Sequence, residues 1–205
     1  SNDLSDFNLM INSGSANVSD GKLYLNGEIK ALLPNYLADF YNYTITSNAT
    51  LVSGETNAKW FSFMYRLQNE NLYYHYIAKV GTTASNGIIH QLRQSSSSWT
   101  YQAQTPYSEA LNASKNYLFK LEAYGNTAGG YINNQKLLRT DEINALSKGK
   151  IGLQVYDVKV AFDDIKVSID FNKAYDYLTP SKYPASDKAS NGLLVNGVAD
   201  FSILA

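Results

Sequence analysis

"GKIGLQVYDVKVAFDDIKVSI", residues 149–169, is the stretch from which the fold can be predicted. Apolar and polar side chains alternate along it with period two, which is typical of strands that bury one face of a sheet. From Val158 to Phe162 the apolar residues keep one parity, and from Ile165 onward they take the opposite parity. A phase switch of one residue predicts two strands with a β-bulge near Asp163-Asp164.

Short alternating runs of the same kind recur along most of the chain. Turn signals at Asp20-Gly21, Asn26-Gly27 and Asn133-Asn134 separate several of them, since these residue types tolerate positive φ. The segment 141–148, "DEINALSK", is the best candidate for a short helical turn. About ten strands with minimal helix predict an all-β fold, a two-sheet antiparallel jelly-roll sandwich.

Composition excludes several classes of function. The formal net charge of −1 provides no field that would attract nucleic acid, so no nucleic-acid partner is predicted. The chain has no cysteine, which rules out disulfides, thiolate zinc sites and cysteine nucleophiles. No apolar run reaches the roughly 18–20 residues of a membrane span. A high content of tyrosine, 17 residues, fits half-buried sheet surfaces.

The two ends of the chain differ from the rest in residue composition and pattern. Residues 1–171 are predicted to form the sandwich, and residues 172–205 to form a linker or a docked C-terminal arm that leads to a further domain. The opening Ser1-Asn2 is typical of a vector-derived remnant, so we expect a signal peptide to precede this segment in the natural chain. Together these features favour an extracellular or cell-wall-associated protein.

The order of the segments resembles a known family. "FSFMYRLQNENLYYHYIAK" at 61–79 is similar to its central hairpin, and "LEAYGNTAGGYINNQKLL" at 121–138 to its small-residue hairpin. The closing stretch at 149–167 resembles its Gly-x-Ile-Gly-Leu strand followed by Phe-Asp-Asp-Ile-x-Val. The family is that of the concanavalin A-like lectin/glucanase jelly rolls, in its bacterial branch of laminin-G-like and keto-disaccharide hydrolase-like domains. The resemblance implies that one sheet is concave and, in many members, holds saccharide.

The hairpin at 60–79 then supplies candidate binding residues. With a four-residue loop at Gln68–Asn71, Tyr65 lies opposite Tyr74 on the core face, while Met64 lies opposite His75 on the other face. In the same register Arg66 lies opposite Tyr73, and Leu67 faces Leu72 on the core face. The closing strand adds outward polar side chains, so the predicted ligand-binding residues are Arg66, Tyr73, His75, Gln154 and Tyr156.

The same side chains have a simpler interpretation. Arginine and tyrosine pairs are common on the solvated face of any antiparallel sheet, where the arginine stem packs on the ring. The sequence alone therefore leaves both a saccharide-binding face and an ordinary sheet surface open.

The residues for catalysis and metal binding are sparse. Glycosidases of this family typically carry a Glu-x-Asp-x-x-Glu run, which the chain lacks; Glu122 is the only acid within a long strand, beside Lys120. His75 and His90 are the only histidines and lack further zinc ligands in sequence. We predict no catalytic residue, no metal site and no cofactor, with calcium as the one alternative, since relatives of this fold bind it through loop oxygens.

Three functions follow from these observations. The first is a non-catalytic carbohydrate-binding or surface-interaction module of a larger secreted bacterial protein, whose partner is an oligo- or polysaccharide. The second is a glycoside hydrolase that acts in the concave groove through a set such as Arg66, His75 and Glu122. The third is a structural spacer, which would be favoured if Trp99 and Tyr101 packed into the groove.

Overall fold

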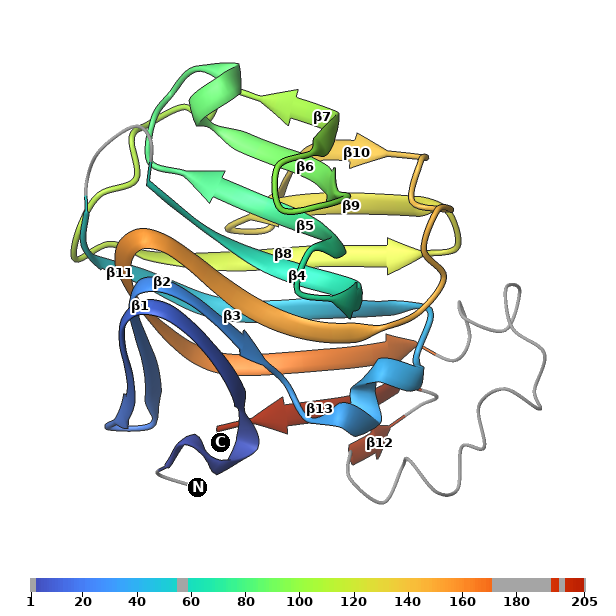
Figure 1. Cartoon of the computed structure of the whole chain (residues 1–205), viewed down its shortest axis with the longest axis horizontal. Coiled ribbons are helices and arrows are strands. Elements are labelled where there is room, and N and C mark those ends of the chain that lie inside the picture. The colour runs from blue at the N-terminus through green and yellow to red at the C-terminus, as the bar shows by residue number, and fades with distance from the viewer. Residues whose placement is uncertain (1–2, 55–58, 171–192, 196–197, 205) are drawn as a thin grey trace.

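A computed structural model describes residues 3–54, 59–170, 193–195 and 198–204. Over these residues the chain folds into an all-β antiparallel jelly-roll sandwich with three 3-10 turns and no α-helix (Figure 1). The 3-10 turns are η1 (Leu4–Asp6), η2 (Asn35–Asp39) and η3 (Ala84–Asn86). The strands are β1 (Asn8–Ser19), β2 (Lys22–Leu32), β3 (Tyr43–Ser53), β4 (Trp60–Asn69), β5 (Leu72–Lys79), β6 (Ile88–Arg93), β7 (Trp99–Thr105), β8 (Asn116–Tyr124), β9 (Thr127–Ile132), β10 (Gln135–Thr140), β11 (Lys150–Asp170), β12 (Leu193–Val195) and β13 (Val198–Ile203).

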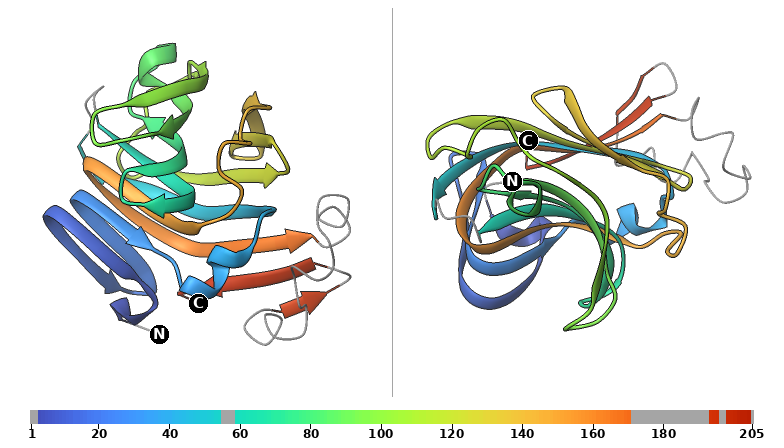
Figure 2. Two further views of the ribbon diagram at one scale, coloured as in Figure 1. Left: turned by 45° about the vertical axis from the view of Figure 1, so that its right-hand side comes forward. Right: turned by 90° about the horizontal axis from the view of Figure 1, so that it is seen from above.

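Strand β11 belongs to both layers of the sandwich. Its first part pairs with β4, its second part pairs with β3 and β13, and β2 runs beside both parts. One layer therefore has the order β7-β6-β5-β4-β11-β2-β1, and the other has the order β10-β9-β8-β3-β11-β13-β12. Figures 1 and 2 show the orange β11 bending back as it passes from one layer to the other. The two strands expected at 149–169 are thus one continuous strand of 21 residues.

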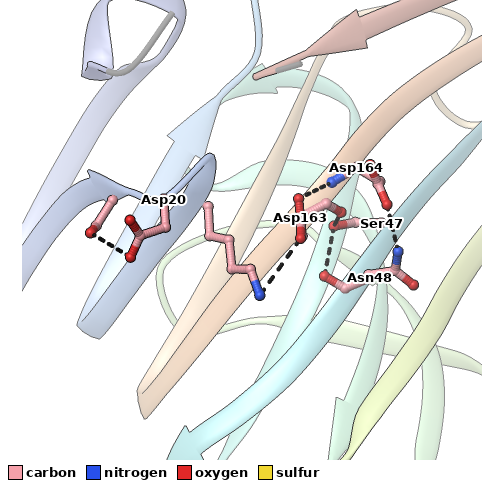
Figure 3. Close-up of polar contacts among 7 residues, drawn as sticks. Asp20, Ser47, Asn48, Asp163 and Asp164 are labelled. Atoms are coloured by element: carbon pink, nitrogen blue, oxygen red, sulfur yellow. Dashed lines mark hydrogen bonds and ion pairs between the residues drawn. The ribbon is translucent and has the colours of Figure 1, made fainter.

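The bulge predicted near Asp163-Asp164 is confirmed (Figure 3). The register with β3 shifts after Asp163, and Asp164 has a left-handed backbone with φ of 49°. The Asp164 N–H donates to Asp163 Oδ1 at 2.9 Å, Asn48 Nδ2 donates to Asp164 Oδ2 at 2.8 Å, and Ser47 Oγ donates to the Asp163 carbonyl oxygen at 2.8 Å. These aspartates therefore satisfy main-chain and side-chain groups of the bulge, as expected for a structural role.

Aromatic rings fill the space between the layers. Phe119 stacks on Tyr76 with 4.3 Å between ring centroids, and Phe61 meets Phe119 edge-on at 5.0 Å. Gly130 makes room for Tyr76, because a Cβ there would lie 2.4 Å from the tyrosine ring. The small-residue hairpin thus lets β9 approach an aromatic side chain of the opposite layer.

The turn predictions have mixed outcomes. Asp20-Gly21 connects β1 to β2, and Asn133-Asn134 connects β9 to β10 with φ of 50° and 65°, so both are confirmed. The turn expected at Asn26-Gly27 is wrong: Gly27 lies within β2, where it faces Gly14 so closely that a Cβ on Gly27 would lie 2.4 Å from the Ser13 carbonyl oxygen. The helical turn expected at 141–148 is also wrong, since that segment is irregular.

The last described strand continues the second layer. β13 pairs antiparallel with residues 165–170 of β11, and its Phe201 packs against Phe40 with 5.5 Å between ring centroids. Residues 171–192, which hold most of the predicted linker, lie outside the described residues. In the described part of the chain no helix is long and apolar enough to cross a membrane.

Candidate functional site

The β4–β5 hairpin sorts its side chains by alternation. Tyr65 pairs with Tyr74 and Met64 pairs with His75, as predicted. Tyr65 and Tyr74 are fully buried in the core between the layers. Met64 and His75 therefore lie on the outer face of the β7-to-β1 layer, because side chains alternate across a strand.

Beyond Tyr65 the predicted register is wrong. Asn69, not Leu67, pairs with Leu72, so the hairpin turns at Glu70-Asn71 after a bulge rather than through a four-residue loop. The bulge begins at Arg66, whose φ is 50°. A slip of one residue exchanges the two faces of a strand, so Leu67 joins a small outer cluster with Met64 instead of the core.

Arg66 consequently leaves the predicted site. Its side chain is only 2% exposed, and its guanidinium donates to four main-chain carbonyl oxygens. Nη1 donates to Ile143 at 2.5 Å and to Leu146 at 3.0 Å, while Nη2 donates to Tyr41 at 3.0 Å and to Gly125 at 2.8 Å. Arg66 is therefore a clamp on three connecting segments. It does not line the cavity on the outer face of the layer, and the expectation that it lies on that face opposite Tyr73 is wrong.

The outer face of the layer is hollowed into a cavity of about 650 Å³, which we call the outer hollow. Strands β1, β2, β4, β5, β6 and β11 and the turn at 70–71 contribute its walls. It brings together four of the five predicted residues, Tyr73, His75, Gln154 and Tyr156. Its lining also includes the side chains of Glu28, Lys30, Trp60, Glu70, Gln91 and Arg93.

The floor of the outer hollow is a set of buried polar side chains. Tyr73 Oη donates to Gln154 Oε1 at 3.2 Å, and the Gln91 amide nitrogen lies 2.5 Å from His75 Nε2. Because an amide nitrogen only donates, His75 Nε2 accepts, which places the imidazole proton on Nδ1. His75 Nδ1 is buried and has no hydrogen-bond partner among the described residues. The amide groups of Gln91 and Gln154 have more donor and acceptor positions than these bonds use, which leaves hydrogen-bonding capacity at the floor.

The electrostatic state of the floor is set mainly by burial. Burial lowers the pKa of His75 well below its usual value of 6.5, and the charges of Arg93 and Lys30 lower it further, together with His90. Burial also raises the pKa of Tyr73. At neutral pH the floor therefore presents a neutral imidazole and a neutral phenol, which act through hydrogen bonds rather than through charge.

An aromatic pair forms the wall beside this floor. The Trp60 and Tyr156 rings stack with 5.5 Å between centroids and an angle of 10° between their planes. Tyr156 is 41% exposed, and Trp60 also meets His75 edge-on at 5.6 Å. A flat apolar surface thus adjoins buried hydrogen-bonding groups.

The prediction missed Lys30, Gln91 and Arg93, which also line the outer hollow. The signal was the same alternation, in "GEIKA" at 27–31 and "IIHQLR" at 88–93, where the intervening residues Ile29 and His90 are buried. Alternation shows only that these side chains point outward. The strand order, which brings β2 and β6 to either side of β11, β4 and β5, is needed to place them at one site.

The other ionisable groups weighed for chemistry lie elsewhere. His90 faces the core, where Tyr65 Oη lies 2.5 Å from its Nε2, and burial lowers its pKa to about 3. Glu122 on β8 accepts from Tyr131 Oη at 2.9 Å and lies 3.4 Å from Lys120 Nζ. Within the described ranges no three histidine, cysteine or acidic side chains gather as metal ligands would.

Solved structures place the fold among jelly-roll lectin folds, consistent with a concanavalin A-like sandwich. Carbohydrate-binding module CBM66 from Bacillus subtilis has a TM-score of 0.59 at 18% identity, over 77% of this chain and 92% of that one. The potassium-bound carbohydrate recognition domain of Emp46p has a TM-score of 0.59 at 14% identity, over 80% and 88%. A Bacillus subtilis protein of unknown function with a galectin-like fold has a TM-score of 0.57 at 15% identity, over 80% and 89%. At these identities the likeness concerns the fold alone. Neither a family model nor a curated protein matches the chain.

Proposed function

We propose that this domain is a non-catalytic carbohydrate-binding module that binds an oligo- or polysaccharide in the outer hollow. The observation that carries the proposal is a buried floor of hydrogen-bonding side chains next to a stacked, partly exposed aromatic pair. Sugars present hydroxyl groups, which need donors and acceptors, and apolar C–H faces, which pack on aromatic rings. Tyr73, His75, Gln91 and Gln154 would meet the hydroxyls, and Tyr156 with Trp60 would meet the ring face.

The fold neighbours support this proposal. One is a carbohydrate-binding module and another is a carbohydrate recognition domain, and both share the sandwich at TM-scores of 0.59. Because one fold hosts many functions, the proposal rests on the side chains of the outer hollow, and the similar folds give it only secondary support.

The wider context belongs to the same proposal. The module acts within a larger secreted or wall-associated bacterial protein and directs a neighbouring domain to its substrate, through the linker predicted from residue 172 onward. The alternating sheets and the near-zero net charge fit such a module better than a nucleic-acid-binding protein.

A glycan array followed by calorimetry on the best ligand tests the proposal. Tyr156→Ala removes one ring of the aromatic pair, and we expect it to weaken saccharide binding by about 3- to 10-fold. Tyr101→Ala is the matched control, because Tyr101 is 48% exposed but does not line the outer hollow. Equal affinities of the two variants and the wild type would remove the outer hollow as the site.

A glycoside hydrolase is the alternative that one observation favours. Two carboxylates, those of Glu28 and Glu70, line the outer hollow. Hydrolysis by the usual mechanisms needs two carboxyl groups about 5–10 Å apart across the bond that is cleaved. If the bound glycan is cut, and Glu28→Gln and Glu70→Gln each abolish the cut, the protein is a hydrolase; an intact glycan supports the module.

The spacer hypothesis meets a physical objection. It would be favoured if Trp99 and Tyr101 filled the groove, but both are exposed, at 44% and 48%, and neither lines the outer hollow. A protein that binds no glycan on the array would nevertheless return this hypothesis to first place.

A further inference from the structure

We propose that the outer hollow selects saccharides that carry an anionic substituent, a carboxylate or a sulfate, and that Lys30 and Arg93 bind this group. The inference rests on the proposed function and names its ligand class. Its basis is the placement of two cations at a neutral, buried polar floor.

Lys30 and Arg93 approach the floor from two sides. Lys30 lies on β2, where it pairs with Gln154 of β11, and Arg93 lies on β6, where it pairs with Tyr73 of β5. Tyr73 Oη and Gln154 Oε1 are joined by a hydrogen bond, so each cation is next to one member of the same buried pair. An anionic group above this pair would be within reach of both cations.

Neither cation has a carboxylate as its hydrogen-bond or ion-pair partner among the described residues. Lys30 Nζ donates to the Glu70 carbonyl oxygen at 2.8 Å, and an Arg93 nitrogen donates to the Ser96 carbonyl oxygen. No ion pair of the described residues includes either one. An ammonium has three donors and a guanidinium has five, so both keep donors for a ligand. The Arg93 guanidinium lies over the Trp99 ring, with its Cζ 5.2 Å from the ring centroid, and this contact helps to hold the side chain in position.

Two acids, Glu28 and Glu70, also line the outer hollow, so the floor is distinguished by where its charges lie rather than by their sum. Glu28 Oε2 accepts from Asn12 Nδ2 at 2.6 Å, and Glu70 Oε1 lies 3.4 Å from Asn71 Nδ2. Among the charged groups that shift the pKa of His75 are Arg93 and Lys30 but neither glutamate. The Glu70 carboxylate thus interacts electrostatically with Lys30. The charges that act on the His75 imidazole include those of Arg93 and Lys30.

The same geometry leaves Lys30 partly desolvated. It is half-buried and burial lowers its pKa, the Glu70 carboxylate opposes that shift, and Arg93 lowers the pKa further. An incoming anion would reduce the repulsion between Lys30 and Arg93 and replace the water that the ammonium loses. Arginine in addition matches the planar geometry of a carboxylate or the oxygens of a sulfate through paired donors.

The experiment is a glycan array on the whole chain in which each anionic glycan is printed beside its uncharged counterpart. Oligogalacturonate is paired with its methyl ester, and sulfated oligosaccharides are paired with the desulfated forms. We expect binding to the charged member of a pair at least tenfold tighter than to the uncharged one, and a loss of this preference at high salt. The two sets of pairs distinguish carboxylate from sulfate recognition.

Variants then locate the selectivity. Lys30→Gln and Arg93→Gln should each lower the ratio of the affinities for the charged and the uncharged member of a pair by threefold or more. Lys159→Gln is the matched control for Lys30, because each lysine lies over a tyrosine ring, at 5.7 Å and 5.6 Å, but Lys159 is outside the outer hollow. Arg139→Gln is the control for Arg93, because Arg139 is an arginine outside the outer hollow.

Equal binding to both members of every pair would overturn this inference and leave the proposed function intact. So would a charge preference that both Lys30→Gln and Arg93→Gln retain. Binding to no glycan at all would overturn the proposed function and this inference with it.

Discussion

The two faces of the β4–β5–β6 strands use buried polar side chains in different ways. On the core face, Arg66 reaches the main chain of distant segments, and His90 bonds to Tyr65. On the outer face, His75 bonds to Gln91, while Tyr73 bonds to Gln154. The first set joins parts of the fold to one another. The side chains of the second set form hydrogen bonds with one another, at the bottom of the outer hollow.

Along the same strands, the core face therefore holds the residues that stabilise the fold, and the outer face holds the residues that we expect to bind ligand. A residue of the core face should be costly to replace but should have little influence on ligand selectivity. A residue of the outer face should have the opposite profile. Adjacent positions with such contrasting roles are a direct consequence of the period-two alternation of a strand.

The largest expected effect is that of replacing the clamp. Arg66→Met leaves four carbonyl oxygens without their donor, and we expect the free energy of unfolding to fall by about 3–5 kcal/mol. Urea denaturation measures the change. Arg93→Met on the outer face is the control and should cost less than about 1 kcal/mol. Similar losses for the two variants would contradict the division between the faces.

A smaller effect is expected where β9 approaches the core. A Cβ at Gly130 would lie 2.4 Å from the Tyr76 ring, whereas at Gly129 the nearest atom, in the Tyr131 side chain, would be 3.3 Å away. Gly130→Ala should therefore destabilise the protein by about 1–3 kcal/mol through overpacking. Gly129→Ala should remain within about 1 kcal/mol of the wild type. Thermal unfolding of the two variants measures the difference. An equal loss of stability in Gly129→Ala and Gly130→Ala would show that side chains do not alternate between the two faces of β9.

The third expected effect is a dependence of stability on pH. The folded protein keeps His90 neutral with a pKa of about 3, while the unfolded chain protonates it below about 6.5. Because the unfolded state then binds more protons, stability is present in full above pH 6.5 and is lost as the pH falls toward 3. Each such histidine contributes about 1.4 kcal/mol per pH unit in this window.

Urea denaturation at pH 7, 6 and 5 measures that slope. His75, whose pKa is also lowered, contributes with the same sign. His90→Gln should reduce the slope by about half while it keeps an amide near Tyr65. A slope that does not change in His90→Gln would mean that the core histidine is not held neutral.

Much of the fold could be predicted because the core face is locally encoded. Alternation placed Tyr65 and Tyr74 in the core, and the parity switch after Phe162 located the bulge at Asp163-Asp164. What alternation cannot show is where a strand slips without a change in its apolar pattern. The left-handed backbone at Arg66 is such a slip.

The slip at Arg66 depends on groups far away in the sequence. Carbonyl oxygens of Tyr41, Gly125 and Ile143 accept from its guanidinium. Gly149 packs against the bulge so closely that a Cβ would lie 2.5 Å from the Leu67 carbonyl oxygen. Only the assembled fold brings these groups together, so the sequence could indicate Tyr73, His75, Gln154 and Tyr156 as outward residues but not exclude Arg66.

The most direct test of the central claim uses the two histidines of the chain as reporters on opposite faces. We would titrate the protein with the best glycan from the array and record ¹H–¹⁵N NMR spectra of the imidazole rings and glutamine side chains. We expect the signals of His75, Gln91 and Gln154 to shift with ligand, while those of His90 stay in place. Shifts of His90 alone, or saturation of binding with no change at His75, would contradict it.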